Sequence, residues 1–275
     1  MRGAPGNGGH RPRRRFGQHF LVDAGVAGRI VELVDPRPGE LVLEIGPGRG
    51  ALTAGLLARL PRLAAVEIDR DLAADLARRF ADPRFHLIVG DVLALDLARL
   101  LAQERQERLL VVGNLPYNIT APLLFRLLEQ APLMSGALLM LQREVARRLA
   151  AQPGGREYGL LTVLLGQRAE MTARLEVDSR AFRPVPKVQS TVLELRFLDR
   201  PRYPVQDEAL FSRVVRAAFG QRRKMLRNSL SSLGTGLDEA AARAAIDLER
   251  RAETLSVEEF GRLSDALAAS GACRD

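Results

Sequence analysis

Between residues 41 and 141 the chain alternates short apolar runs with segments of helical periodicity, and this alternation constrains its fold more than any other feature. The apolar runs lie at residues 41–45, 63–67, 85–89, 109–113 and 137–141. The helices between them are predicted near residues 51–60, 71–80, 96–104 and 120–130. Because the runs lack polar alternation, they predict strands of a parallel sheet that helices cover on both faces. The sequence therefore predicts a doubly wound α/β sheet whose ligand binds beyond the carboxyl ends of the strands.

The segments on either side of this core complete the predicted organisation. Asp23 can cap a helix that runs to about residue 34, and the Pro/Gly-rich residues 36–39 end it. Further strands are predicted at residues 170–177 and 190–198, before a Pro-rich break at 201–204. Beyond the break the periodicity is helical only, at residues 207–219, 222–231, 238–247 and 256–269. We expect a disordered basic tail over residues 1–15, an α/β domain over 16–200 and a small helical domain over 201–275.

The net charge of +8 in this chain of 275 residues is unevenly distributed. Residues 1–15 carry five arginines and no acid, residues 200–235 carry a net +6, and the body between them is close to neutral. Two concentrated basic segments beside a neutral body indicate a protein that binds a polyanion. The segment that contains Arg222, Arg223, Lys224 and Arg227 favours contact with nucleic acid, the alternative being a merely solvated face.

Composition excludes several classes of protein. Hydrophobic residues make up 47% of the chain, which is enough for a full core, and no run approaches the ~18 apolar residues of a membrane-spanning helix. The single Cys273 and three scattered histidines predict neither a disulfide nor a metal site. The basic N-terminus lacks the apolar segment of a secretory signal, and no heptad seam is present. We expect a cytoplasmic monomer that uses no metal.

Glycine and acidic residues follow the first three predicted strands in order. Gly46, Gly48 and Ala51 fit a G-x-G-x-x-A turn, in which glycines let a ligand approach the backbone closely. Glu67 ends the second strand and can accept both hydroxyls of a ribose, and Asp91 follows the third strand. Taken singly, these residues are also compatible with plain turns and exposed carboxylates. Together they predict a nucleoside-type cofactor, either NAD or S-adenosylmethionine.

The sequence Asn114-Leu115-Pro116-Tyr117 at the end of the fourth predicted strand distinguishes between these two cofactors and favours S-adenosylmethionine. The exocyclic amine of adenine is a poor nucleophile, so an enzyme that methylates it must hold both amine hydrogens with acceptors. The Asn114 side-chain carbonyl and the Leu115 backbone carbonyl can supply that pair. Tyr117 offers a face on which an extruded base can stack. This interpretation is favoured over a simple Asn-Pro turn, since the three preceding strand ends agree with it.

Longer motifs resemble those of the rRNA adenine dimethyltransferases, over about residues 13 to 265. The matching segments are Phe16–Leu21, Leu43–Gly48, Glu67–Asp69, Gly90–Asp91, Gly113–Asn118, Ala181–Val188 and Phe219–Asn228. The resemblance implies a Rossmann-like class I methyltransferase fold with a small C-terminal helical domain. It further implies S-adenosylmethionine as methyl donor and two adjacent adenosines as substrate, in the 3′-terminal hairpin loop of 16S rRNA. The partner would be 16S rRNA within the immature small ribosomal subunit.

The resemblance also implies roles for individual residues. The cofactor would be bound by His19, Leu21, Gly46, Glu67, Asp91 and Asn114. Phe182 would stack on the target base opposite Tyr117, although spacing alone would make it a buried aromatic beside a Pro-rich loop. Many members of the family have Asn at the position of His19. The basic segment at 222–227 would face the RNA backbone.

Three rival functions remain open at this point. A large-subunit rRNA methyltransferase of the macrolide-resistance type shares the strand-end motifs, but the segments at 182–188 and 222–228 match the small-subunit group better. A non-catalytic assembly or transcription factor on the same fold would have no need for the complete strand-end set. An NAD-dependent oxidoreductase would have no use for Asn-Leu-Pro-Tyr.

Overall fold

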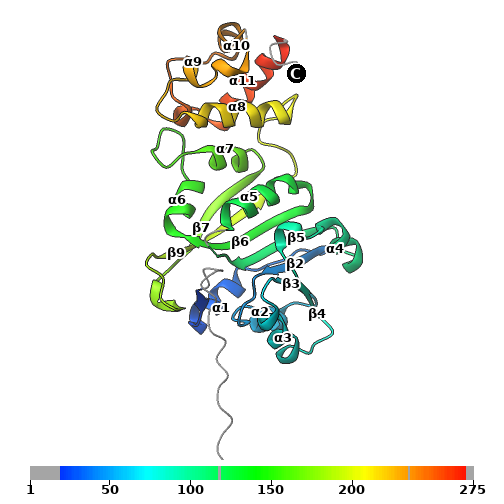
Figure 1. The fold of residues 1–275 in the computed structure, drawn as a ribbon. Coiled ribbons are helices and arrows are strands. Elements are labelled where there is room, and N and C mark those ends of the chain that lie inside the picture. Colours follow the sequence, from blue (N-terminus) through cyan, green and yellow to red (C-terminus); the bar gives the residue numbers. More distant parts are fainter. Residues whose placement is uncertain (1–18, 117–118, 235, 271–275) are drawn as a thin grey trace, which may run out of the picture. The chain divides into compact units, whose positions relative to one another are not determined.

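A seven-stranded sheet is the central element of the computed structural model, which describes residues 19–116, 119–234 and 236–270 (Figure 1). The strand order is β4-β3-β2-β5-β6-β9-β7. Its strands are β2 Glu40–Ile45, β3 Leu63–Glu67, β4 Phe85–Val89, β5 Arg108–Asn114, β6 Met134–Gln142, β7 Ala169–Val177 and β9 Ser190–Phe197. A separate two-stranded sheet pairs β1 Phe20–Leu21 with β8 Phe182–Arg183 in antiparallel fashion.

The parallel arrangement predicted from the apolar runs is confirmed. β2 pairs in parallel with β3 and β5, β4 joins β3, and β6 joins β5. β3 is buried at all five positions, as expected for a strand covered on both faces. β4 ends the sheet order and is partly exposed, because only one strand flanks it.

Helices fill the predicted intervals and often begin at a capping aspartate. They are α1 Ala24–Glu32, α2 Thr53–Arg59, α3 Arg70–Arg79, α4 Leu97–Glu104, α5 Thr120–Glu129, α6 Arg143–Leu149, α7 Leu160–Gly166, α8 Glu208–Gly220, α9 Leu226–Ser229, α10 Leu237–Ala244 and α11 Val257–Ala269. The Asp23 side chain accepts a hydrogen bond from the Val26 amide at 3.0 Å, so the predicted start of α1 is confirmed. Asp69 and Asp96 cap α3 and α4 in the same way.

Three local features differ from the sequence expectation. The β1–β8 pair and the seven-residue helices α6 and α7 were not predicted, because each is too short to display a clear hydrophobic period. The helix predicted over 222–231 is wrong for its first four residues. Met225 forms an antiparallel bridge with Arg251 there, so its backbone is extended and the helix begins only at Leu226.

The described residues divide into two compact units. The first contains the chain up to Arg143 together with Arg174–Leu193, and the second contains Glu144–Ala173 together with the chain from Glu194 onward. In the first unit, α1 and α2 pack against β2, β5 and β6 in one apolar cluster. In the second, the core lies between α8 and α11, where Phe211 and Phe260 are fully buried. A functional boundary near residue 200 stays a prediction.

No helix within the described ranges is both long and apolar enough to cross a membrane.

Candidate functional site

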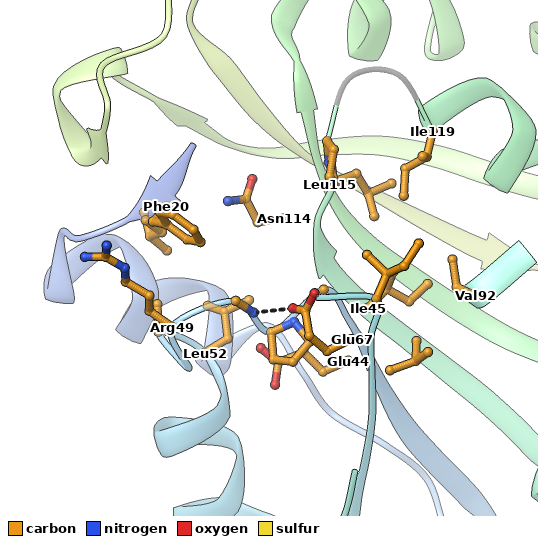
Figure 2. A pocket seen from close by; sticks show the side chains of 18 of the residues that line it. Phe20, Glu44, Ile45, Arg49, Leu52, Glu67, Val92, Asn114, Leu115 and Ile119 are labelled. Atoms are coloured by element: carbon orange, nitrogen blue, oxygen red, sulfur yellow. Dashed lines mark hydrogen bonds between the residues drawn. The ribbon is translucent and has the colours of Figure 1, made fainter. Parts of the chain in front are cut away.

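A cavity of about 340 Å³ lies in the first unit at the carboxyl ends of β2, β3, β4 and β5 (Figure 2). This volume falls within the ~300–1,000 Å³ typical of small-molecule sites. Every residue predicted to bind the cofactor lines it, namely His19, Leu21, Gly46, Glu67, Asp91 and Asn114. Parallel strands end at the same edge of a sheet, which is why Gly46, Glu67, Asp91 and Asn114 meet in one cavity. His19 and Leu21 reach it from the separate β1–β8 pair.

The glycine turn after β2 leaves its side of the cavity open. Gly46 and Gly48 have φ of +63° and +57°, a backbone conformation that favours glycine. The Gly46 amide donates to the Val66 carbonyl at 2.9 Å, which ties the turn to β3. A Cβ atom on Gly46 would meet nothing within 4 Å, whereas one on Gly48 would lie 3.2 Å from the Phe20 ring. A ligand can therefore approach the backbone at Gly46.

Glu67 is held rigidly at the end of β3. Its carboxylate accepts a hydrogen bond from the Gly48 amide at 3.0 Å (Figure 2), and its other oxygen accepts one from the Asp69 amide at 2.9 Å. Burial raises the pKa of this carboxyl above its ordinary value, and the neighbouring Asp69 acts in the same direction, while the backbone donors oppose both. Each oxygen keeps a second lone pair, so the group can also accept hydrogen bonds from ligand hydroxyls.

Glu44 is a second carboxylate in the wall of the cavity, and sequence reasoning gave it no role. It is only 2% exposed, and the Thr53 hydroxyl donates to it at 2.7 Å. Burial raises its pKa to about 7, against the opposing effect of the Thr53 hydrogen bond, and repulsion from Glu67 adds to the increase. Its position inside the Leu43–Gly48 motif was the one signal that could have identified it.

Three further side chains shape the rim. Asp91 uses one carboxylate oxygen to accept from the Leu93 amide at 2.9 Å, which fixes the side chain beside Gly90. The Arg49 guanidinium lies 4.8 Å from the centre of the Phe20 ring, a cation–π contact that Figure 2 shows at the β1 side. Both Phe20 and Arg49 line the cavity although neither was singled out from the sequence.

The residues predicted to act on the substrate base are partly described. Asn114 and Leu115 line the cavity, and the Asn114 amide donates to the His19 carbonyl at 3.0 Å. Phe182 lines the same cavity but is only 1% exposed, so a base can stack on it only if the residues covering it move. Tyr117 lies outside the described residues.

The basic residues predicted to bind RNA belong to the second unit and fall into two pairs. Arg222 donates to the carbonyls of Arg156 and Tyr158, and Arg227 forms ion pairs with carboxylates of the same unit. Arg223 and Lys224 are exposed, and neither has an ion pair or side-chain hydrogen bond within the part of the chain that the structure describes.

Over the described ranges, no group of three or more His, Cys, Asp or Glu side chains is arranged to hold a metal ion.

Comparison with known proteins identifies close relatives over almost the whole chain. The family model described as ribosomal RNA adenine dimethylase matches residues 9–269. A protein of Geobacter metallireducens named ribosomal RNA small subunit methyltransferase A is 47% identical, over 96% of this chain and 98% of its own. A protein of the same name from Thiobacillus denitrificans is 48% identical, over 94% and 99%.

Solved structures share the fold. A 23S rRNA methyltransferase, ErmE, is 29% identical with a TM-score of 0.70, over 90% of this chain and 99% of its own. A dimethyladenosine transferase from Plasmodium falciparum has a TM-score of 0.76, over 92% of this chain and 99% of its own. Because its sequence identity is 22%, this similarity is evidence for the fold alone. The observed architecture is therefore the Rossmann-like methyltransferase fold with a helical C-terminal region.

Proposed function

Because this chain belongs to the ribosomal RNA adenine dimethylase family, we propose that it dimethylates two adjacent adenosines in the 3′-terminal hairpin loop of 16S rRNA. The enzyme is a methyltransferase that depends on S-adenosylmethionine. The observation that carries the proposal is the convergence of Gly46, Glu67, Asp91 and Asn114 on one cavity at the carboxyl ends of four adjacent strands.

The chain's residues fit this cofactor. The open side of Gly46 accommodates a ligand against the backbone, and Glu67 has lone pairs for the two hydroxyls of a ribose. Asp91 keeps a carboxylate oxygen beyond its bond to Leu93, and this oxygen would accept from the adenine amine of the cofactor. When bound, S-adenosylmethionine supplies an electrophilic methyl group.

Asn114 and Leu115 would prepare the target amine. Their side-chain and backbone carbonyls would each accept one amine hydrogen, so that the nitrogen lone pair is directed at the methyl group instead of into the ring. Methyl transfer makes the nitrogen acidic, and one proton then leaves to water. The proposed stacking of the base between Tyr117 and Phe182 requires the nearly buried Phe182 ring to become accessible on binding.

The RNA partner would be the immature small subunit, bound by a monomer in the cytoplasm. The exposed Arg223 and Lys224 are suited to phosphate contacts, and the affinity should fall steeply with added salt because such contacts release counterions.

The macrolide-resistance type of methyltransferase is the main alternative. It is less well supported, because ErmE is 29% identical to this chain whereas the small-subunit relatives are 47% and 48% identical.

In the decisive experiment, the protein is incubated with labelled S-adenosylmethionine and small subunits that lack these modifications. The RNA is then analysed by nucleoside mass spectrometry. Dimethyladenosine confined to the two adjacent positions of the 3′-terminal hairpin is the expected result. Large subunits and protein-free 16S rRNA serve as parallel substrates.

Labelling of large-subunit RNA alone would replace the proposal with the resistance-type activity. Absence of label on every substrate, under conditions where an authentic enzyme of the family is active, would indicate a non-catalytic binding factor.

A further inference from the structure

Two hydrogen bonds join three distant segments at the mouth of the cavity. The Asn114 side-chain nitrogen donates to the His19 backbone carbonyl at 3.0 Å, across 95 positions of the chain. The His19 ring nitrogen Nδ1 lies 2.7 Å from the Pro184 carbonyl, across 165 positions. His19 therefore contacts the Asn-Leu-Pro-Tyr strand end with its backbone and the loop after β8 with its ring.

The chemistry of the acceptors fixes how these groups are oriented. A backbone carbonyl only accepts hydrogen bonds, so the Nδ1 atom that faces Pro184 must carry a hydrogen. For the same reason the atom of Asn114 that faces His19 must be the amide nitrogen. Since the amide is planar, anchoring its nitrogen also fixes the direction of its oxygen Oδ1. The oxygen is then available to accept a hydrogen bond from a ligand in the cavity.

We propose that His19 is a positioning residue for methyl transfer, which anchors the Asn114 amide so that Oδ1 faces the target amine. The inference rests on the proposed function, because it names what Asn114 is oriented for. It assigns the His19 ring to Pro184, whereas the family resemblance implied a contact between His19 and the cofactor.

The His19 ring and the β1–β8 pairing restrain different parts of this segment. Phe20 and Leu21 are held by backbone pairing with β8, and the amides of Val22 and Asp23 donate to the Ala181 carbonyl. The ring of His19 holds the residue whose carbonyl receives Asn114. Without the ring, that carbonyl would lose one restraint and would be positioned by the peptide plane that it shares with the Phe20 amide of β1.

The test compares His19→Leu with His19→Asn in the full chain. Leucine cannot donate to Pro184, whereas the Asn Nδ2 atom is the same number of bonds from Cβ as the histidine Nδ1 and can. We expect His19→Leu to lower the single-turnover methylation rate about tenfold, the effect of about one lost hydrogen bond. The dissociation constant for S-adenosylmethionine, measured by calorimetry, should stay within about twofold, and His19→Asn should restore most of the rate.

Two further experiments complete the test: a double-mutant cycle, and an NMR measurement on the protein without cofactor. In an Asn114→Ala background, His19→Leu should have no further effect on the rate, because the two act through one contact. In the unsubstituted protein without cofactor, NMR should show one Asn114 side-chain amide proton protected from exchange, and His19→Leu should remove that protection. The exchange measurement does not require methyl transfer. It can therefore contradict the role of His19 even if the proposed function is correct, and support it even if the proposed function is wrong.

Three results would overturn the inference. One is weaker cofactor binding by His19→Leu at an unchanged rate, which would make the ring a cofactor ligand. Another is an additive rate loss in the double mutant, and the third is rapid exchange of the Asn114 amide in the unsubstituted protein.

Discussion

The residues proposed to bind the cofactor, in the first unit, and the basic residues of the second unit differ in how their positions along the chain relate to their positions in space. Gly46, Glu67, Asp91 and Asn114 are far apart along the chain and nevertheless line one cavity. The basic residues between 222 and 227 are almost consecutive, yet the fold divides them between internal contacts and solvent. In this molecule, distance along the chain is a poor guide to which residues act together.

The difference has a physical cause. A residue at the carboxyl end of a parallel strand is placed by the backbone hydrogen bonds of the whole sheet, so its location follows from the topology. An arginine on the surface has a long side chain whose contacts depend on whichever acceptors the fold brings near. The acceptors of Arg227 are Asp238 and Glu249, which the sequence alone does not place beside it.

The largest predicted effect tests the first unit at the site where the strands converge. Replacing Asn114 by Ala removes the amide oxygen that would accept from the target amine. We expect the methylation rate to fall at least about 10²- to 10³-fold, comparable to the loss of one preorganised polar group in other active sites. Affinity for RNA, measured by filter binding, should be largely retained.

Gln103→Ala, which removes an exposed amide from α4, is the matched control and should leave the rate unchanged. If Asn114→Ala weakened RNA binding as strongly as methylation, Asn114 would be a structural residue and the contrast between the two units would weaken.

The second prediction concerns Glu44, whose buried carboxyl has its pKa raised from 4.5 to about 7. Between these values the unfolded chain loses the proton while the folded chain keeps it, so this group lowers stability as pH rises from about 4.5 to 7. Glu44→Gln keeps an acceptor for the Thr53 hydroxyl but cannot ionise. Without cofactor, the variant should exceed the unsubstituted protein in unfolding free energy by about 3 kcal/mol above pH 7.

The difference in unfolding free energy should shrink as pH falls toward 5, which urea titrations at a series of pH values would measure. Glu32→Gln, at an exposed position of α1, is the matched control. A constant difference across this range would mean that Glu44 is not protonated in the folded state.

The same contrast explains how much of the molecule the sequence could predict. The parallel strands and the cavity residues Gly46, Glu67, Asp91 and Asn114 followed from apolar runs and strand-end motifs, because sheet topology determines both. His19, Leu21 and Phe182 were expected only from the family resemblance. The roles of Glu44 and Arg49 did not follow, since their contacts with Thr53 and Phe20 depend on side-chain packing between segments. The extended backbone at Met225 was missed because its partner Arg251 is remote in sequence.

A third prediction tests the exposed pair of basic residues. Replacing both Arg223 and Lys224 by Ala should weaken RNA binding and lower the slope of log affinity against log salt by about 1.5 to 2, the effect of two lost phosphate contacts. The unfolding free energy should change by less than about 0.5 kcal/mol, because neither side chain has a partner among the described residues. An unchanged salt slope would contradict the assignment of this pair to RNA.

The smallest effect is predicted for Arg227, which is ion-paired within the second unit, unlike the exposed Arg223 and Lys224. Its guanidinium is about half exposed and lies 2.7 Å from Asp238 and 3.1 Å from Glu249. Such exposed ion pairs are screened by solvent and contribute little, so Arg227→Ala should lower the unfolding free energy only slightly. Because two carboxylates already neutralise this cation, its loss should leave the salt slope of RNA binding nearly unchanged. Urea titration and salt-dependent filter binding measure the two quantities. A slope reduced as much as by Arg223→Ala alone would mean that RNA displaces Asp238 and Glu249 from Arg227, and that neighbours along the chain do act together there.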